Sequence, residues 1–283
     1  MTGPHAPTHA TGDIPPDSAY ATELALALDL ATRAGELQMD RYERVGRIDY
    51  KSARDVVTEV DHLSEALILD GIRAAFPADA ILAEETGEHD AAAGHSASSG
   101  IGRVWVVDPL DGTVNYANGI PVFCVSVALA VDGVATVGVI RDPTRDETFA
   151  ATADGPATLN GRPIRPSEKE RLSDFVISMA LSGRAVATRA RAVRKAIRVS
   201  RSMGSSALAL AYVANGRFDA FVQQGGLSIW DIAAAGLIAE RAGATVTNMV
   251  GGPWFDVSAP SRSIGVLAAP PAHHGDLLRR ITG

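Results

Sequence analysis

The segment 104–115, Val-Trp-Val-Val-Asp-Pro-Leu-Asp-Gly-Thr-Val-Asn, constrains this chain more than any other stretch. Its apolar start predicts a buried strand, which we expect to break at Asp108-Pro109. A second carboxylate, Asp111, follows three residues later and is itself followed by Gly112-Thr113. Two carboxylates at the end of a strand can share a hard metal ion, and a Gly-Thr turn can present N–H groups to an anion. The segment therefore indicates metal-assisted phosphate chemistry.

Composition narrows the kind of protein in which this segment operates. The chain has 283 residues, 46% of them hydrophobic, which is enough for one large domain with a substantial core. A formal net charge of −7 without a long basic run argues against a nucleic-acid partner held by charge. A small phosphorylated substrate is compatible with that charge, because metal ions supply local positive charge in an acidic protein.

The sequence also bears on the cellular location of the protein and on its cysteine chemistry. The proline-rich residues 1–18 lack an apolar core, so we expect a disordered tail and no secretory signal. No run of about 18 apolar residues occurs, so we expect a cytoplasmic protein without a membrane partner. The single cysteine, Cys124, excludes an internal disulfide, and its apolar neighbours favour a small core residue over a nucleophile.

Residues 19–283 are expected to form one domain of two halves, about 19–165 and 166–283. Apolar periodicity in the first half predicts helices over 19–39 and 60–76, followed by strands with mostly antiparallel neighbours over 80–83, 104–107, 124–131, 135–140 and 147–152. The side chains expected to face inward on the second helix are Leu63, Leu67, Ile68, Ile72 and Ala75. Residues 86–102, rich in Gly, Ala, Ser and His, indicate a mobile loop.

The second half alternates strands with helices. Strands are expected over 175–179, 218–222 and 264–268, and helices over 188–197, 205–215, 229–242 and 275–281. The order of the elements predicts mixed α and β halves packed as alternating layers.

Four carboxylates stand where an apolar segment ends or a helix begins: Glu84, Asp108, Asp111 and Asp231. Each alone has an ordinary explanation as a loop charge, a turn residue or a partner of a helix dipole. Together they meet the number that two Mg²⁺ ions about 4 Å apart require when some carboxylates bridge. Spacing in the sequence does not show that the fold brings the four together.

Several segments resemble the inositol monophosphatase family, in the order in which the family has them. Asp-Pro-Leu-Asp-Gly-Thr-Val-Asn at 108–115 is similar to the first family signature, and Trp-Asp-Ile-Ala-Ala-Ala-Gly at 230–236 to the second. Leu-Ala-Glu-Glu at 82–85 and Asp-Val-Val-Thr-Glu-Val-Asp at 55–61 match further family segments. The resemblance covers about residues 20–282. It implies an αβαβα sandwich of the sugar-phosphatase type, dependence on two or three Mg²⁺ ions, and phosphomonoester hydrolysis by a metal-activated water.

The resemblance also implies a set of metal ligands. Glu84, Asp108 and the backbone carbonyl of Leu110 would surround the first ion. Asp108, Asp111 and Asp231 would hold the second ion, and a third, weaker ion would touch Glu84.

Further residues are implied for catalysis and phosphate binding. Thr113, paired with Asp61, would orient and deprotonate the attacking water, so that both count as catalytic together with Glu84. The N–H groups of Gly112 and Thr113 would hold the phosphate. The phosphoryl transition state needs charge stabilisation more than covalent help, so no nucleophilic side chain is required.

Substrate residues are implied by two other places. Gly204-Ser205-Ser206 resembles the segment that lines the inositol site in relatives, although either serine can also cap the following helix. Where the family often has a glutamate that accepts bonds from sugar hydroxyls, this chain has Gln223, which lacks the charge-assisted interaction.

The implied substrate is a small polyol or sugar phosphate, with inositol 1-phosphate as the first candidate. Histidinol phosphate, fructose 1,6-bisphosphate and 3′-phosphoadenosine 5′-phosphate are the alternatives within the family. A non-catalytic regulatory protein that kept the fold is the alternative from another class. A homodimer is expected from the resemblance alone.

Overall fold

The computed structural model describes residues 18–42, 48–52, 55–90, 97, 101–181, 187–259 and 261–283. For residues 48–52 and 55–57 it describes the backbone but not the side chains. The expected tail over 1–18 lies outside the described residues apart from Ser18, as does most of 91–100.

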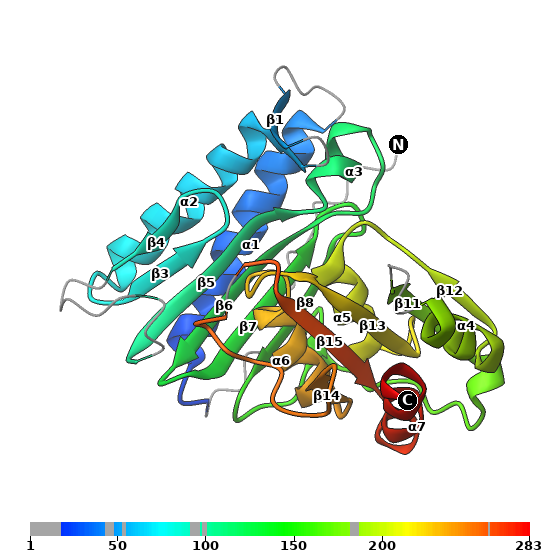
Figure 1. Cartoon of the computed structure of the whole chain (residues 1–283). Helices are drawn as coiled ribbons and strands as arrows, with labels where there is room; N and C mark the ends of the chain where they lie inside the picture. Colours follow the sequence, from blue (N-terminus) through cyan, green and yellow to red (C-terminus); the bar gives the residue numbers. More distant parts are fainter. Residues whose placement is uncertain are drawn as a thin grey trace, which may run out of the picture.

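An eight-stranded sheet forms the larger half of the molecule (Figure 1). Its strands follow the order β10-β9-β8-β7-β6-β5-β3-β4, and the β3–β5 pair is its parallel pair. The bounds are β3 (Ala80–Ala83), β4 (Gly87–His89), β5 (Arg103–Asp111), β6 (Cys124–Val131), β7 (Val134–Asp142), β8 (Glu147–Thr152), β9 (Thr158–Leu159) and β10 (Arg162–Pro163).

A five-stranded sheet of order β12-β11-β13-β15-β14 forms the smaller half. Strand β11 runs parallel to both of its neighbours, whereas β15 is antiparallel to β13 and β14. The bounds are β11 (Val176–Ala180), β12 (Val199–Arg201), β13 (Ala220–Leu227), β14 (Thr245–Asn248) and β15 (Ile264–Ala269). A separate hairpin joins β1 (Ile48–Ser52) to β2 (Asp55–Thr58), and a 3₁₀ turn spans Leu172–Asp174.

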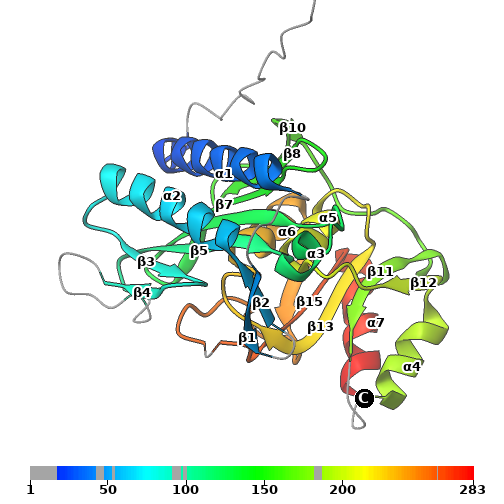
Figure 2. The same ribbon diagram turned by 90° about the horizontal axis from the view of Figure 1, so that it is seen from above.

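Three helix layers alternate with the two sheets (Figures 1 and 2). Helices α1 (Ala21–Arg41) and α2 (Glu59–Ala75) cover one face of the large sheet and share a core with β3, β5, β6 and β7. Helices α5 (Ser206–Ala214) and α6 (Ala233–Ala242) lie between the sheets, and α4 (Ala187–Ala196) and α7 (Pro271–Thr282) pack on the outer face of the small sheet. Together these layers confirm the predicted αβαβα architecture.

The composition of the middle layer explains its place. Residues 207–214 of α5 are all buried, and a helix that is apolar on every side can be stable only inside the protein. Helix α6 approaches the large sheet closely at Gly138, where an added Cβ would lie 2.7 Å from the carbonyl oxygen of Ala234. This close contact fixes the start of α6, and the turn before it, against β6 and β7.

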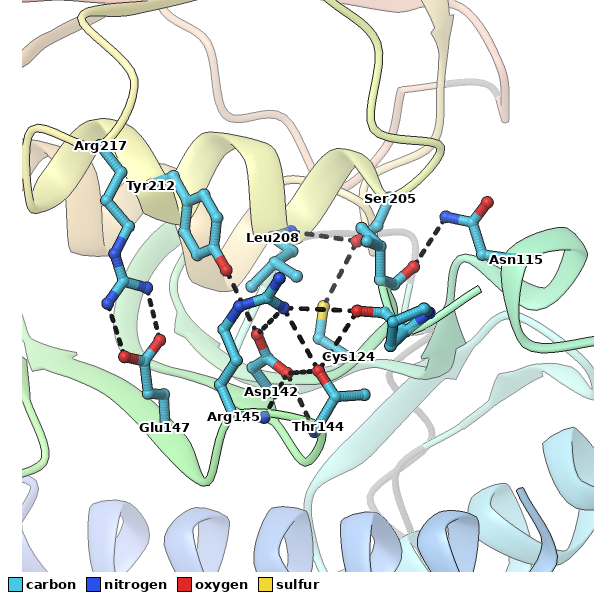
Figure 3. A network of polar contacts seen from close by, with 12 residues as sticks. Asn115, Cys124, Asp142, Thr144, Arg145, Glu147, Ser205, Leu208, Tyr212 and Arg217 are labelled. Atoms are coloured by element: carbon cyan, nitrogen blue, oxygen red, sulfur yellow. Dashed lines mark hydrogen bonds and ion pairs between the residues drawn. The ribbon is translucent and has the colours of Figure 1, made fainter. Parts of the chain in front are cut away.

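A buried acid at the end of β7 belongs to the scaffold. Asp142, fully buried at the end of β7, accepts hydrogen bonds from the Thr144 hydroxyl at 2.7 Å and from the Tyr212 hydroxyl at 3.3 Å, and it pairs with Arg145 at 3.0 Å. Figure 3 shows these contacts linking the β7–β8 turn to α5. Each oxygen of this carboxylate has a hydrogen-bond or ion-pair partner in the protein, so its charge is stabilised without a metal ion.

Most predicted elements are present, but the buried face of α2 differs from the prediction. Leu63 and Ala75 were expected to face inward, and both are exposed. The buried face instead carries Asp61 and Glu65 in its first half. The apolar pattern was misleading at Leu63 because the first half of α2 directs polar side chains toward the interior.

Three other expectations need correction. Strand β5 does not break at Asp108-Pro109 but continues to Asp111 through a register shift against β6. Residues 87–89 of the expected mobile loop form β4, which pairs with β3. Helix α6 begins at Ala233 and not at 229. In β4 and at the end of β5, pairing with a neighbouring strand stabilises extended backbone that the local sequence alone does not predict.

Candidate active site

Three carboxylates from two distant segments of the chain meet at the end of β5. One oxygen from each of Asp108, Asp111 and Asp231 lies within 4.8 Å of the others. Asp108 and Asp111 are buried on β5, and Asp231 is partly buried in the turn that precedes α6. The register shift between Asp108 and Asp111 allows both side chains of this strand to contribute to one cluster.

Electrostatics in the cluster favour protonation when no cation is near. Burial raises the pKa of Asp108 well above its usual range, and the charges of Glu84, Asp111 and Asp231 add to the effect. Burial and the charge of Asp111 likewise raise the pKa of Asp231, while burial raises the pKa of Asp111 against the opposing hydrogen bonds from Ser205 and Ala207. A divalent cation would reverse this penalty, because it stabilises the ionised carboxylates.

Each carboxylate is oriented by hydrogen bonds. Asp108 Oδ1 accepts from the backbone N–H of Leu110 at 3.0 Å, and Asp231 Oδ2 accepts from the backbone N–H of Ser228 at 2.7 Å. Asp111 Oδ2 accepts from Ser205 Oγ at 2.5 Å and from the backbone N–H of Ala207 at 2.7 Å. Asp111 therefore lies at the N-terminus of α5, where the helix dipole favours a negative charge.

Glu84 reaches the same place through the parallel pairing of β3 with β5. Ala83 is level with Val107 in that pairing, so the residues that follow each strand are neighbours. The N–H of Glu84 donates to the carbonyl of Val107 at 3.2 Å, and the charge of Glu84 raises the pKa of Asp108. Glu84 and Asp231 both line a cavity of about 440 Å³. The oxygen-only donor set of Glu84, Asp108, Asp111 and Asp231, together with the mutual repulsion of its charges, fits a hard divalent cation.

Asp61 and Thr113 form a hydrogen-bonded pair beside the carboxylates. Thr113 Oγ1 lies 2.9 Å from Asp61 Oδ1 and 3.0 Å from the carbonyl oxygen of Leu110. Asp61 is fully buried, and its other oxygen accepts from the N–H and the hydroxyl of Thr58 in the capping box that starts α2. A threonine that donates its proton to such a carboxylate keeps its own lone pairs for a water molecule.

Gly112 begins the short helix α3 (Thr113–Ala117) in a left-handed conformation with φ of 99°. An added Cβ would lie 2.9 Å from the carbonyl oxygen of Val122, so space and backbone both require glycine. The turn brings the N–H groups of Gly112 and Thr113 close to the end of β5, next to Asp111.

The residues implied for substrate binding differ in their surroundings. Ser206 lines the cavity, and its hydroxyl lies 3.5 Å from Gln223 Oε1. Ser205 is buried, donates to Asp111 and accepts from the N–H of Leu208 at 3.4 Å as the N-cap of α5. Gly204, with φ of 80°, packs on Asn115. Of these four residues, Ser206 lines the cavity, and Gln223 lies next to Ser206.

Asn115 is a site residue to which the sequence motif gave no role. Its Nδ2 donates to the carbonyl of Val122 at 2.7 Å and to the carbonyl of Met203 at 2.8 Å. Figure 3 shows Asn115 and Cys124 on two sides of Ser205. Asn115 thereby ties the segment after α3 to the segment that starts α5. Its place within the 108–115 signature was the only signal that could have found it.

Other side chains near the site confirm or extend the expectations. Cys124 is buried, and burial together with the charge of Asp111 raises the pKa of its thiol, which disfavours the nucleophilic thiolate. Ser228 and Arg262 line the cavity, but no motif in the sequence pointed to them.

Comparison with known proteins identifies the family. The family model described as the inositol monophosphatase family matches residues 20–282. The chain belongs to the inositol monophosphatase family. The resemblance read from the segments at 82–85, 108–115 and 230–236 is thereby confirmed.

Family members differ in the names they carry. The chain is 36% identical to a protein named Nus factor SuhB from Pseudomonas aeruginosa, over 81% of this chain and 86% of that protein. It is 35% identical to a fructose-1,6-bisphosphatase/inositol-1-monophosphatase from Thermotoga maritima, over 81% of this chain and 85% of that protein. The expectation that the chain has no nucleic-acid partner finds no support in the first of these names.

Solved structures of family members share the fold. The extragenic suppressor protein suhB from Bartonella henselae superimposes with a TM-score of 0.83 at 32% identity, covering 92% of this chain and 98% of that one. The inositol monophosphatase (IMPase) of Thermotoga maritima gives a TM-score of 0.80 at 31% identity, covering 92% and 96%. Within the part of the chain that the structure describes, no helix is both long and apolar enough to cross a membrane.

Proposed function

We propose that this protein is a Mg²⁺-dependent phosphomonoesterase that hydrolyses a small polyol or sugar phosphate, with inositol 1-phosphate as the first candidate. The observation that carries the proposal is the cluster of Asp108, Asp111 and Asp231, whose ligand oxygens lie within 4.8 Å of one another. Burial and mutual repulsion raise the pKa values of these acids, which is the situation that a bound divalent cation relieves.

The same residues suit the binding of two or three Mg²⁺ ions. Glu84, Asp108 and the carbonyl of Leu110 would hold one ion, Asp108, Asp111 and Asp231 a second, and Glu84 a third, weaker one. When bound, the ions lower the pKa of the attacking water and neutralise charge on the phosphoryl group.

The remaining residues would position the reactants. Thr113 Oγ1 lies 2.9 Å from Asp61 Oδ1, so the hydroxyl donates its hydrogen bond to the carboxylate and its oxygen can accept one from the attacking water. The N–H groups of Gly112 and Thr113 would hold the phosphate oxygens. Ser206 and Gln223 would contact the alcohol part of the ester, and Gly204 and Ser205 would support that wall from behind.

A phosphate-release assay with the Asp111→Asn variant tests the proposal. We expect near-total loss of Mg²⁺-dependent release with the fold intact, because the amide keeps the shape but not the charge of the ligand. Asp70→Asn, the same change on the exposed face of α2, is the control and should turn over normally. Unchanged turnover by Asp111→Asn would refute the assignment of this site. Inositol 1-phosphate, histidinol phosphate, fructose 1,6-bisphosphate and 3′-phosphoadenosine 5′-phosphate form the substrate panel.

A regulatory role without catalysis is the second candidate, and the relatives named Nus factor SuhB favour it. It predicts no Mg²⁺-dependent release from any ester in the panel. We further propose that the protein is a cytoplasmic homodimer, which sedimentation of the purified chain tests for the oligomeric state.

A further inference from the structure

A buried glutamine on α1 contacts the turn that carries the proposed metal ligands. Gln38 is fully buried, and its Nε2 donates a hydrogen bond to the carbonyl of Pro109 at 2.7 Å, 71 positions along the chain. Pro109 lies between Asp108 and Leu110, both of which the proposed function assigns to Mg²⁺. We propose that Gln38 is a positioning residue for this Mg²⁺ site, because it holds the Pro109–Leu110 peptide in the orientation that Asp108 requires. The inference rests on the proposed phosphatase function and adds a residue to its site.

Hydrogen bonds fix this one peptide at both ends. Its N–H, on Leu110, donates to Asp108 Oδ1 at 3.0 Å, and its carbonyl, on Pro109, accepts from Gln38. The N–H and the carbonyl of a trans peptide point in opposite directions, so rotation of the peptide plane would break both bonds together. The preceding peptide cannot supply a donor instead, because Pro109 has no N–H. Gln38 therefore keeps an N–H directed at Asp108 Oδ1, which orients that carboxylate.

The backbone of Gln38 holds the other end of the same segment. Its carbonyl accepts a hydrogen bond from the hydroxyl of Tyr116 at 2.8 Å, and Tyr116 is fully buried on α3. The carbonyl of Leu110, which accepts from Thr113 Oγ1 at 3.0 Å, lies between these two contacts, as does Gly112. The segment proposed to hold the cation and the phosphate is thus fixed to α1 both before and after its turn.

The amide of Gln38 is a costly choice for a buried position. Its Oε1 is buried and has no hydrogen-bond partner among the residues that the structure describes. A buried polar atom without a partner is destabilising, and an apolar side chain of similar length would avoid that cost. The orientation of the amide is determined, because Oε1 in place of Nε2 would set two acceptors against each other at Pro109. The glutamine thus supplies a donor to one defined carbonyl rather than a well-satisfied core contact.

The helix that carries Gln38 is held firmly in place. Ala34, one turn before it, is fully buried in the core that α1 shares with α2 and the large sheet. At Gly35, an added Cβ would lie 3.2 Å from both Arg141 Cγ and Pro143 Cβ, so α1 lies close to the end of β7. Closely packed elements resist displacement, and a position set by a packed helix is more precise than one set by a loop.

Gln38→Met tests the role of the amide. Methionine has a similar length but no donor, so it preserves the packing and removes the bond to Pro109. Leu30→Met, a change at a fully buried position of the same helix, is the control. Mg²⁺ binding to each purified protein is measured by isothermal titration calorimetry. Phosphate release is then measured against Mg²⁺ concentration and against the ester that the wild-type protein hydrolyses fastest.

We expect Gln38→Met to raise the Mg²⁺ dissociation constant about 10-fold, while KM for the ester at saturating Mg²⁺ stays within about twofold. Leu30→Met should bind Mg²⁺ as the wild type does. Wild-type Mg²⁺ affinity in Gln38→Met would overturn the inference, and so would a rise in KM for the ester without a change in Mg²⁺ affinity.

Amide hydrogen exchange of the metal-free proteins separates positioning from a general loss of stability. We expect faster exchange in Gln38→Met over residues 108–112, which include the N–H of Leu110, and unchanged exchange in α2 and β6. Equally faster exchange in all three segments would overturn the inference, because Gln38 would then stabilise the core as a whole. Failure of the proposed function has a different signature, since the wild-type protein itself would neither bind Mg²⁺ nor release phosphate.

Discussion

Replacement of Ser205 by alanine separates two roles for the segment at 204–206. The resemblance assigns Ser205 to the substrate, whereas the structure buries its hydroxyl between Asp111 Oδ2, at 2.5 Å, and the N–H of Leu208, at 3.4 Å. We expect Ser205→Ala to weaken Mg²⁺ binding and to leave the KM for the phosphate ester unchanged. The reason is that the hydroxyl orients a carboxylate that would ligate the metal.

The size of the effect follows from the two lost interactions. A hydrogen bond to a charged group contributes about 1.5–3 kcal/mol, and an N-cap about 1 kcal/mol. The cap bond is long at 3.4 Å, so its share is small. We therefore expect the free energy of unfolding to fall by about 2 kcal/mol and the half-saturating Mg²⁺ concentration to rise about 10- to 100-fold, as for other residues that support metal ligands.

The pH dependence has a definite sign. The hydrogen bond from Ser205 lowers the pKa of Asp111. Its removal raises that pKa further above the ordinary value, so more of the carboxyl is protonated at any given pH, and protons compete better with Mg²⁺. The rise in half-saturating Mg²⁺ should consequently be larger at pH 6 than at pH 8.

The assay is Mg²⁺ activation of phosphate release at saturating ester, followed by KM for the ester at saturating Mg²⁺. Ser206→Ala is the matched control, because Ser206 lines the cavity and contacts Gln223. It should raise KM with little change in Mg²⁺ activation. The reasoning is refuted if Ser205→Ala raises KM for the ester while its Mg²⁺ activation curve coincides with that of the wild type.

Two further predictions concern stability. Gly102→Ala places a Cβ in open space at φ of 78°, whereas Gly112→Ala places it 2.9 Å from the Val122 carbonyl oxygen at φ of 99°. In urea unfolding, Gly112→Ala should therefore lose about 1–3 kcal/mol more unfolding free energy than Gly102→Ala. Equal losses in the two variants would contradict the steric argument. Because the pKa values of Asp108 and its neighbours are raised in the fold, these carboxyl groups bind more protons in the metal-free native state than in the unfolded chain, and their contribution to the unfolding free energy falls as pH rises from their ordinary pKa toward the raised ones. Added Mg²⁺ should therefore raise Tm more at pH 8 than at pH 5, and an equal or smaller shift at pH 8 would contradict the electrostatic account.

Local sequence signals predicted the elements well where the backbone decides the structure. Asp132-Gly133 and Asn160-Gly161 form tight turns with positive φ at both positions, which these residue types adopt most easily. The strand at Glu147–Thr152 has the predicted bounds. Strands β12 and β14 were not predicted, because they are short and their hydrogen bonds come from β11 and β15.

Apolar periodicity failed where polar side chains that support the site are buried. Asp61 and Glu65 lie on the buried face of the first half of α2, whereas Leu63 and Ala75, the last residue of the helix, are exposed. Glu65 accepts a hydrogen bond from the N–H of Glu85 at 2.9 Å, so the burial of this acid supports the Glu84-Glu85 segment. Periodicity records where apolar residues fall, and it cannot show which polar residues the site requires inside.

The sequence by itself determined the chemical identities at the site: an oxygen-only set of acids, a glycine that needs a left-handed backbone, and a threonine beside it. Motif order was enough to indicate the family, since each motif is read from consecutive residues. Only the tertiary structure decided which groups meet. Packing of α6 on β7 brings Asp231 to the end of β5, and β3–β5 pairing brings Glu84 beside Asp108. The tertiary structure also directs Ser205 toward Asp111 and places Arg262 on the cavity wall. Such contacts join residues far apart in the sequence, 94 positions in the case of Ser205 and Asp111, and they depend on the shapes of packed layers, which no local pattern encodes.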